Sequence, residues 1–187
     1  MNWSQNYLWS GTNENKGIGI FAKAGVQIQK LDWPDDDLKF FLPARINDEF
    51  DLLACWCHGA GSPTFGYIGQ LWKYIQISNS VMGQAVLVGD FNSNKIWDVW
   101  DRWWNHSDVL NELNKIGIRS LYHEYFEEEQ GEEISPTLFL QRNIAKPYHI
   151  DYIMAPYKTV SKCTSVKVGS HIEWLKYSDH MPLFAEW

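Results

Sequence analysis

The sequence has no long apolar run and no targeting signal at its start. No stretch of about 18 uncharged apolar residues occurs, which argues against a membrane-spanning helix. The first residues, Met1-Asn2-Trp3-Ser4-Gln5, carry neither the basic nor the apolar segment of a secretory signal peptide. We therefore expect a cytoplasmic protein that makes no use of a membrane.

Cysteine is also scarce. The three cysteines, Cys55, Cys57 and Cys163, cannot all pair and show no disulfide framework, which is typical of a reducing compartment. The run Cys55-Trp56-Cys57-His58 invites a comparison with zinc sites. A structural zinc site needs four ligands, however, and no second cysteine pair is present, so we expect no zinc here.

The sequence has fewer basic than acidic side chains. The chain has 16 basic and 23 acidic side chains, a formal net charge of −7. Proteins that coat nucleic acid non-specifically need many cations to neutralise phosphates, so that class is disfavoured. An enzyme that brings metal ions to a phosphate remains compatible with this charge.

Tryptophan, in contrast, is abundant, with 11 in 187 residues. The length predicts one domain over residues 1–187, with an irregular N-terminal segment over residues 1–16. Four tryptophans cluster at positions 97, 100, 103 and 104. We expect them to lie mostly in the core, with one or two able to stack on a nucleic-acid base.

Short apolar segments separated by turns predict a layered α+β domain. The expected strands are residues 15–23, 26–28, 50–58, 85–88, 118–125, 137–141, 148–155, 160–168 and 183–187, and the expected helices are residues 66–78 and 107–117, the second capped by Ser107. In the strand over residues 50–58, the period of two places Leu52, Trp56 and His58 on one face.

Three segments put acidic, amide or imidazole groups at strand ends: Gly89–Ser93, His149–Tyr152 and Ser178–Leu183. Taken singly, each has an ordinary interpretation, such as an Asx turn, a histidine bound to a backbone carbonyl, or a cap. A carboxylate at the rim of a sheet can also bind a hard cation such as Mg²⁺. Together and in this order, they indicate a single site.

The ordered set resembles the endonuclease/exonuclease/phosphatase superfamily, which has the deoxyribonuclease-I-like fold. The matching motifs are Gly89-Asp90-Phe91-Asn92, Asp151-Tyr152-Ile153, and Ser178-Asp179-His180-Met181-Pro182, with a further strand that ends at His58. The resemblance covers Gly17 to Trp187. It implies a four-layer α/β/β/α sandwich, truncated at the N-terminus, and a phosphoester hydrolase.

The resemblance also implies catalytic roles. Asp90 would orient the attacking water, and Asn92 would hydrogen-bond the phosphoryl oxygens. His180 would act as general base or as charged partner of the transition state, and Asp151 would fix its tautomer. His58 would donate to the phosphate or to the leaving oxygen.

Metal and substrate contacts follow in the same way. The resemblance implies that Asp90, Asn92 and Asp179 contact Mg²⁺ or Mn²⁺. The family's strand threonine near the substrate corresponds to Thr137. Lys95 and Arg142 flank the motif segments, and we expect them to bind phosphates together with Asn92.

One part of the family pattern is missing. The family begins with a strand bearing Asn, a helix and a strand ending in Gln-Glu, and that Glu is the principal magnesium ligand. Residues 1–16 are too few for these elements. Glu14 lies in a polar loop and is not expected to replace the ligand, and the acids at positions 124, 127–129, 132 and 133 are expected to form a solvated face.

Three explanations of the missing part stay open. The true start lies upstream, another chain or a second copy supplies the segment, or the protein is a short form with weakened catalysis. The loss of central strands would expose sheet edges, so we expect self-association or a partner chain.

The sequence leaves three functional hypotheses. The first is a Mg²⁺- or Mn²⁺-dependent phosphodiesterase, a nuclease acting on DNA or RNA. The second is a binding or assembly module that keeps the fold without the metal centre. The third is a phosphatase for small phosphoesters, because a fold does not fix its substrate.

Overall fold

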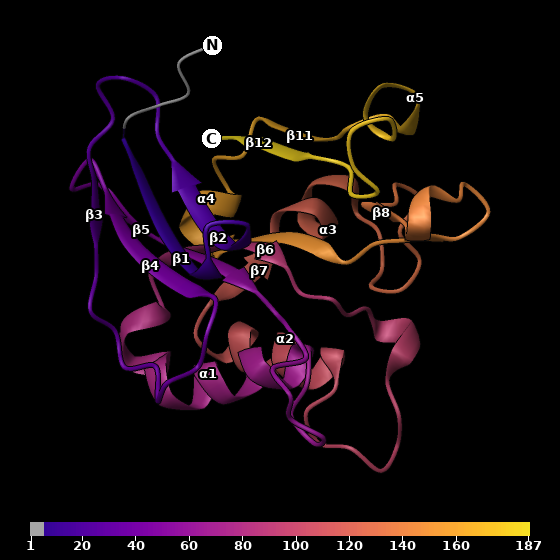
Figure 1. Cartoon of the computed structure of the whole chain (residues 1–187), viewed down its shortest axis with the longest axis horizontal. Helices are drawn as coiled ribbons and strands as arrows, with labels where there is room; N and C mark the ends of the chain where they lie inside the picture. The colour runs from indigo at the N-terminus through magenta and orange to yellow at the C-terminus, as the bar shows by residue number, and fades with distance from the viewer. Residues whose placement is uncertain (1–5) are drawn as a thin grey trace.

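The computed structural model describes residues 6–187, and a six-stranded mixed sheet lies at its centre (Figure 1). In spatial order, its strands are β3 (Ile28–Lys30), β4 (Phe41–Ile46), β5 (Phe50–Trp56), β6 (Ala85–Asp90), β10 (Asp151–Pro156) and β7 (Ile118–Ser120). Within this sheet β5 and β6 run parallel, and the other neighbours run antiparallel. A parallel pair needs a long crossover connection, which helix α1 (Ile68–Met82) provides.

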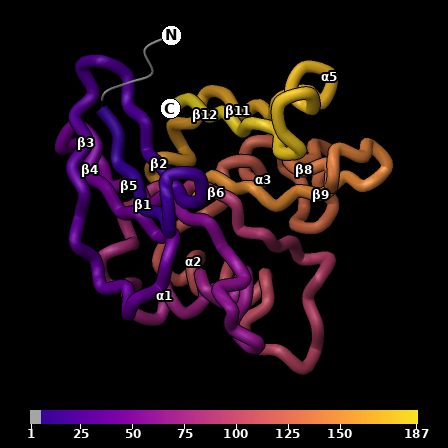
Figure 2. Tube along the Cα trace, viewed as in Figure 1, coloured from indigo at the N-terminus to yellow at the C-terminus, as the bar shows by residue number. Residues whose placement is uncertain are grey.

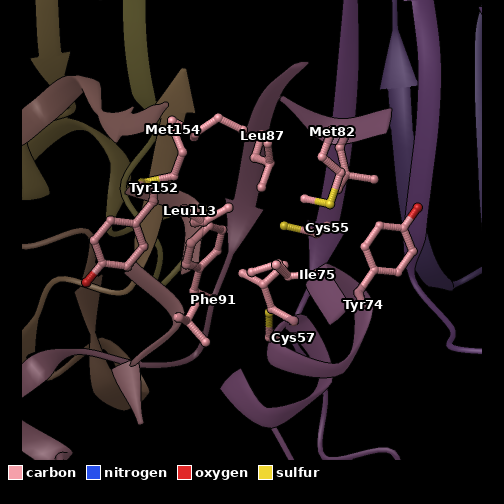
Figure 3. Close-up of a cluster of buried hydrophobic side chains, with 14 of the residues drawn as sticks. Cys55, Cys57, Tyr74, Ile75, Met82, Leu87, Phe91, Leu113, Tyr152 and Met154 are labelled. Atoms are coloured by element: carbon pink, nitrogen blue, oxygen red, sulfur yellow. The ribbon is translucent and has the colours of Figure 1, made fainter. Parts of the chain in front are cut away.

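Helices α1 and α2 (His106–Lys115) cover one face of this sheet (Figure 1). The side chains between the layers are closed off from water: Leu53 of β5, Leu71 of α1 and Leu113 of α2 are each 0% exposed. Figure 3 shows part of this cluster, in which Cys55 and Cys57 point into the apolar core. This face holds the main hydrophobic core.

Two separate hairpin sheets lie on the opposite face (Figures 1 and 2). One is formed by β1 (Tyr7–Asn13) and β2 (Lys16–Phe21), and β2 packs on β5. The other is formed by β11 (Ser165–Val168) and β12 (Leu183–Glu186), and β12 packs on β10. Over residues 6–187 the two hairpins do not pair with each other, so β2 and β12 each keep one free edge.

The middle of this second face is less completely covered. Phe50, Leu52 and Val88 contact the apolar clusters beneath both hairpins, yet each stays partly exposed. The strand alternation expected for β5 is confirmed, because Leu52 belongs to this face and Leu53 to the helix-covered face.

The remaining elements are short. They are η1 (Lys95–Trp97), α3 (Leu121–Phe126), β8 (Leu138–Phe139), η2 (Leu140–Arg142), β9 (Pro147–Tyr148), α4 (Tyr157–Val160) and α5 (His171–Trp174). No helix within residues 6–187 has the length and apolar character needed to cross a membrane.

Some local expectations are wrong. Residues 1–16 are not irregular throughout, because Tyr7–Asn13 forms β1; the first five residues lie outside the described part. The expected strand over residues 118–125 ends at Ser120. Its hydroxyl accepts from the backbone N–H of His123 and starts helix α3 instead.

Helix α2 also begins one residue earlier than its expected cap at Ser107. Asn105 is the residue before the helix, and its backbone N–H donates to the carboxylate of Asp108 at 2.8 Å. The side chain of Asp108 therefore fixes the start of the helix.

The tryptophan cluster is the largest departure. Trp100 is 96% exposed, Trp103 is 64% exposed and Trp97 is 41% exposed, so the expected core position is wrong for these three. Trp104 alone of the four packs inward, against Phe65. The four tryptophans do not lie on a single helix, because the chain leaves helical geometry after Trp97 and turns.

Candidate active site

Two carboxylates meet at one end of the central sheet. Asp90 is the last residue of β6 and Asp151 is the first residue of β10, and the antiparallel register pairs them directly. Directly paired residues have Cβ atoms about 4.5–5.5 Å apart. The fold therefore places two acidic groups side by side, an arrangement that a sheet without a function at this point would avoid.

His180 completes the cluster from the turn before β12. Its Nδ1 lies 3.0 Å and 3.1 Å from the two carboxylate oxygens of Asp151. With the Nδ1 proton directed at Asp151, Nε2 is the nitrogen left to face a substrate. The sequence prediction that Asp151 orients His180 thus corresponds to a direct contact.

Thr137 hydrogen-bonds the two segments that carry Asp151 and His180. Its Oγ1 accepts from the backbone N–H groups of Ile150 at 2.9 Å and Asp151 at 3.0 Å. Its carbonyl accepts from the N–H of Met181, next to His180, at 2.7 Å. The residue is 0% exposed, and its expected contact with substrate stays a prediction. It fixes the positions of the segments that carry Asp151 and His180.

Burial and neighbouring charges shift the pKa values of the cluster. Burial, followed by the charge of Asp151, raises the pKa of Asp90 to about 7, although hydrogen bonds from Asn92 oppose the shift. The hydrogen bond with Asp151 raises the pKa of His180 to about 9, in spite of burial. His180 is therefore mostly protonated at pH 7 in the ion-free protein. This state favours the charged-partner interpretation over the general-base one.

Asn92 closes the turn after β6. Its backbone φ of 47° lies in the left-handed region that asparagine tolerates. Its Nδ2 donates to Asp90 Oδ2 at 2.6 Å and to the carbonyl of Cys57 at 3.1 Å. Both amide protons are thus used inside the protein, and the predicted donation to a phosphoryl oxygen requires release from Asp90.

Gly89 allows β6 to run this close to β5. Its φ is 146°, and a Cβ at this position would lie 1.8 Å from the carbonyl oxygen of Cys55. Only glycine fits there without moving the strand that delivers Asp90.

His58 follows β5 at the same end of the sheet. Its Nδ1 accepts from the backbone N–H of Ala60 at 2.9 Å, which leaves the ring proton on Nε2, the form able to donate to a phosphate. Burial, followed by the charge of Lys16, lowers the pKa of His58. Lys16 is the first residue of β2 and places its Nζ 5.7 Å from the centroid of the Trp56 ring. Lys16 was not predicted from the sequence, because no motif surrounds it.

Three predicted residues are not brought into the cluster. Asp179 contributes its carbonyl to the N–H of Phe139 at 2.8 Å, but its carboxylate is not part of the Asp90–Asp151–His180 group. Lys95 is exposed on η1, and Arg142 is exposed and donates to the carbonyl of Tyr177 at 3.1 Å. The metal role of Asp179 and the substrate roles of Lys95 and Arg142 stay predictions.

A buried polar network beside the site was also missed. The carboxylate of Glu133 accepts from Asn94 Nδ2 at 3.0 Å and from the backbone N–H of Gly131 at 3.0 Å, and it contacts His123 Nε2 at 3.0 Å. Burial alone would raise the pKa of Glu133, but the hydrogen bonds, first that of His123, lower it to about 2. Its side chain is 4% exposed, so Glu133 does not belong to the expected solvated face.

The same network reaches the start of β10. Asn94 Nδ2 also donates to the carbonyl of His149 at 3.0 Å, and His149 Nδ1 bonds the carbonyl of Ser135 at 2.8 Å. The interpretation that His149 satisfies a backbone carbonyl is confirmed. One residue could have indicated this network from the sequence. It is Asn94, which lies two residues after the motif residue Asn92.

The donor set of the cluster fits a hard divalent cation. One ligand atom each from Asp90, Asp151 and His180 lies within 4.8 Å of the others. Carboxylate oxygens are the ligands that Mg²⁺ and Mn²⁺ prefer. The raised pKa of Asp90 means that a second negative charge is unfavourable here until positive charge compensates it. The two carboxylates, Asp90 and Asp151, would therefore hold such a cation, with protonated His180 beside them.

Comparisons with known proteins identify the fold. No protein-family model matches the chain, and no curated protein matches it in sequence. Among solved structures, a 3'-5' exonuclease from Neisseria meningitidis superimposes with a TM-score of 0.70 at 21% identity, over 97% of this chain and 79% of that chain. An AP endonuclease from Archaeoglobus fulgidus gives a TM-score of 0.67 at 19% identity, over 97% and 78%. The endonuclease domain of TRAS1, a telomere-specific non-LTR retrotransposon, gives 0.61 at 14%, over 95% and 76%.

These similarities show that the chain has the deoxyribonuclease-I-like fold, as its motifs predict. The expected fold class is confirmed, and of its four expected layers residues 6–187 show a helix layer, a central sheet and a layer built from two small sheets.

Proposed function

We propose that this protein is a divalent-metal-dependent phosphodiesterase that cleaves nucleic acid. The observation that carries the proposal is the Asp90–Asp151–His180 cluster, in which a protonated imidazole and two carboxylates gather at the rim of a sheet. The solved neighbours named as an exonuclease and an AP endonuclease support a nucleic-acid substrate. So does a neighbour described as a 3' phosphatase from Neisseria bound to a product DNA hairpin.

On this proposal each side chain has a task in phosphoryl displacement, in which charge builds up on the equatorial oxygens. Mg²⁺ or Mn²⁺ held by Asp90 and Asp151 would supply positive charge to the phosphate. Protonated His180 adds a second positive group, and His58 donates from Nε2. The Asp90 carboxylate would also orient the attacking water.

The test is cleavage of plasmid DNA and of labelled DNA and RNA oligonucleotides with Mg²⁺, with Mn²⁺ and with EDTA. We expect cleavage with metal only, and loss of cleavage in Asp90→Ala and His180→Ala. Asp36→Ala and His171→Ala, which remove an exposed acid and an exposed histidine outside the cluster, serve as matched controls. Identical traces from the wild type and the two cluster variants would mean that the activity belongs to a contaminant.

A second candidate is a binding or assembly module of the same fold without catalysis. The observation that favours it is the small ligand group, in which two carboxylates and one imidazole are the only clustered donors found in residues 6–187. Calorimetric titration with Mg²⁺ and Mn²⁺ separates the two candidates. Tight binding that vanishes in Asp90→Ala would eliminate the inert module.

We also propose that the chain associates with itself or with a partner chain. The free edges of β2 and β12, with the partly exposed Phe50, Leu52 and Val88 between them, support this proposal. Light scattering over a range of concentrations tests self-association, and a monodisperse monomer at all of them would count against it.

A further inference from the structure

Residues 95–105 form a loop, here called the tryptophan loop, that presents aromatic side chains to water. Trp100 is 96% exposed and Trp103 is 64% exposed. A tryptophan side chain offers about 150–250 Å² for burial. Because Trp100 and Trp103 stay largely in water, the protein does not gain the large hydrophobic stabilisation that their burial would give. Such exposure on a folded protein marks a contact surface.

Hydrogen bonds hold the tryptophan loop in one conformation, so the exposure of its tryptophans is part of the folded structure. Asn105 donates from Nδ2 to the carbonyls of Val99 at 2.9 Å and Arg102 at 2.6 Å. Its Oδ1 accepts from Val99 N–H at 3.0 Å and from Arg102 Nε at 2.8 Å. Arg102 in turn donates to the carbonyl of Trp97 at 3.1 Å and stacks over Trp104, 4.6 Å from its ring. The exposed rings therefore stand on a fixed base.

The tryptophan loop adjoins the candidate active site. Trp97, Arg102 and Trp104 line a cavity of ≈ 330 Å³ together with Asn92, the residue that hydrogen-bonds Asp90. The ring of Trp97 also contacts that of Tyr148, at 5.2 Å between centroids, close to the start of β10. A nucleic acid with its phosphate at the cluster would thus pass within reach of this loop.

We propose that Trp100 and Trp103 stack on unpaired bases of the nucleic acid that is bound at the Asp90–Asp151–His180 cluster. This inference rests on the proposed function and deepens it, because it names unpaired nucleotides beside the cleaved bond as the preferred substrate. Every base has a flat π-face, so stacking of this kind tolerates any sequence.

The charge of the tryptophan loop favours bases over phosphates as the contact. Lys95 and Arg102 are balanced by Asp98 and Asp101, and Asp98 is already engaged with the N–H of His106 at 2.9 Å. A loop without excess positive charge releases few counterions on binding. The contribution of its tryptophans should therefore vary little with salt, unlike that of phosphate contacts.

The test is fluorescence anisotropy with a labelled single-stranded oligonucleotide and with its duplex, in EDTA so that no cleavage intervenes. We expect Trp100→Ala and Trp103→Ala each to weaken single-strand binding by about 5- to 150-fold, the equivalent of one lost stacking contact. The slope of log Kd against log salt should stay unchanged, and duplex binding should weaken less. Trp100→Phe should retain most of the affinity.

Tyr157→Ala, which removes an exposed aromatic ring on α4, is the matched control. Unchanged single-strand affinity in both tryptophan variants overturns the inference. Wild-type cleavage with Mg²⁺ is measured separately. Cleavage without any effect of the tryptophans on binding refutes this inference alone, and tryptophan-dependent binding without cleavage refutes the proposed function alone.

Discussion

The two faces of the central sheet differ, although the same strands build both. Leu53 of β5 points toward α1 and α2 and is 0% exposed, whereas its neighbour Leu52 points toward the hairpins and is partly exposed. Asp90 ends β6 on the same face as Val88, which is also partly exposed. The closed face supplies the packing, and the open face carries the polar chemistry at its rim.

The difference shows how one sheet serves two demands. Close packing on the helix side stabilises the strand register, and the register determines that Asp90 lies opposite Asp151. The open side leaves room for a phosphate and a cation at the same strand ends. Changes on the two faces should therefore affect different measured quantities.

The largest effect is expected at the rim. Asp151→Asn keeps the shape of the side chain but removes the carboxylate whose hydrogen bond and charge raise the pKa of His180, so His180 should become neutral near pH 7. We expect kcat to fall by about 10²- to 10⁴-fold, while the free energy of unfolding changes little. The pH profile of kcat/KM and urea unfolding are the measurements. A loss of stability that matches the loss of rate would assign Asp151 to packing instead.

The second-largest effect is expected from a pair of variants that compares the two faces of the central sheet directly. Leu53→Ala removes a fully buried side chain and should lower the free energy of unfolding by about 2–5 kcal/mol. Leu52→Ala, one residue earlier on the open face, should cost clearly less because its environment is already part solvent. Urea denaturation of both variants provides the comparison. Equal losses would mean that the open face is covered in solution, for example by a second copy of the chain.

The smallest effect is expected in the buried polar network around Glu133. Glu133→Ala leaves Asn94, His123 and the N–H of Gly131 without their shared acceptor and should cost about 1–3 kcal/mol. The pKa of Glu133 is about 2 in the folded protein, below its usual value of 4.5. Its stabilisation is therefore complete above pH 4.5 and is lost as the pH falls toward 2.

Unfolding of wild type and Glu133→Ala between pH 2 and pH 7 tests this prediction. The gap between the two curves should narrow in acid. Glu132→Ala, which alters the exposed neighbouring acid, is the control, and a gap that stays constant across the range would contradict the role assigned to Glu133.

Whether the sequence predicted a region depended on the chemistry of the residues in that region. The motif residues Asp90, Asp151 and His180 were predicted because each carries its polar group at a strand end. Strand β4 was not predicted, because Pro43 lies within it and proline usually argues against a strand; here its carbonyl accepts from Leu31 instead. Glu133 was not predicted because its burial depends on His123 and Asn94, which are distant from it in the chain.

The pairing of Asp90 with Asp151 also has a consequence for the stability of the fold. The two carboxylates join β6 to β10 at the last position of their ladder, so a cation shared between them would cross-link the end of the sheet. An ion that binds the folded chain alone adds about 2.7 kcal/mol to its stability at one hundred times the dissociation constant. The supply of divalent ions in the surroundings would then set the melting temperature as well as the rate of the reaction.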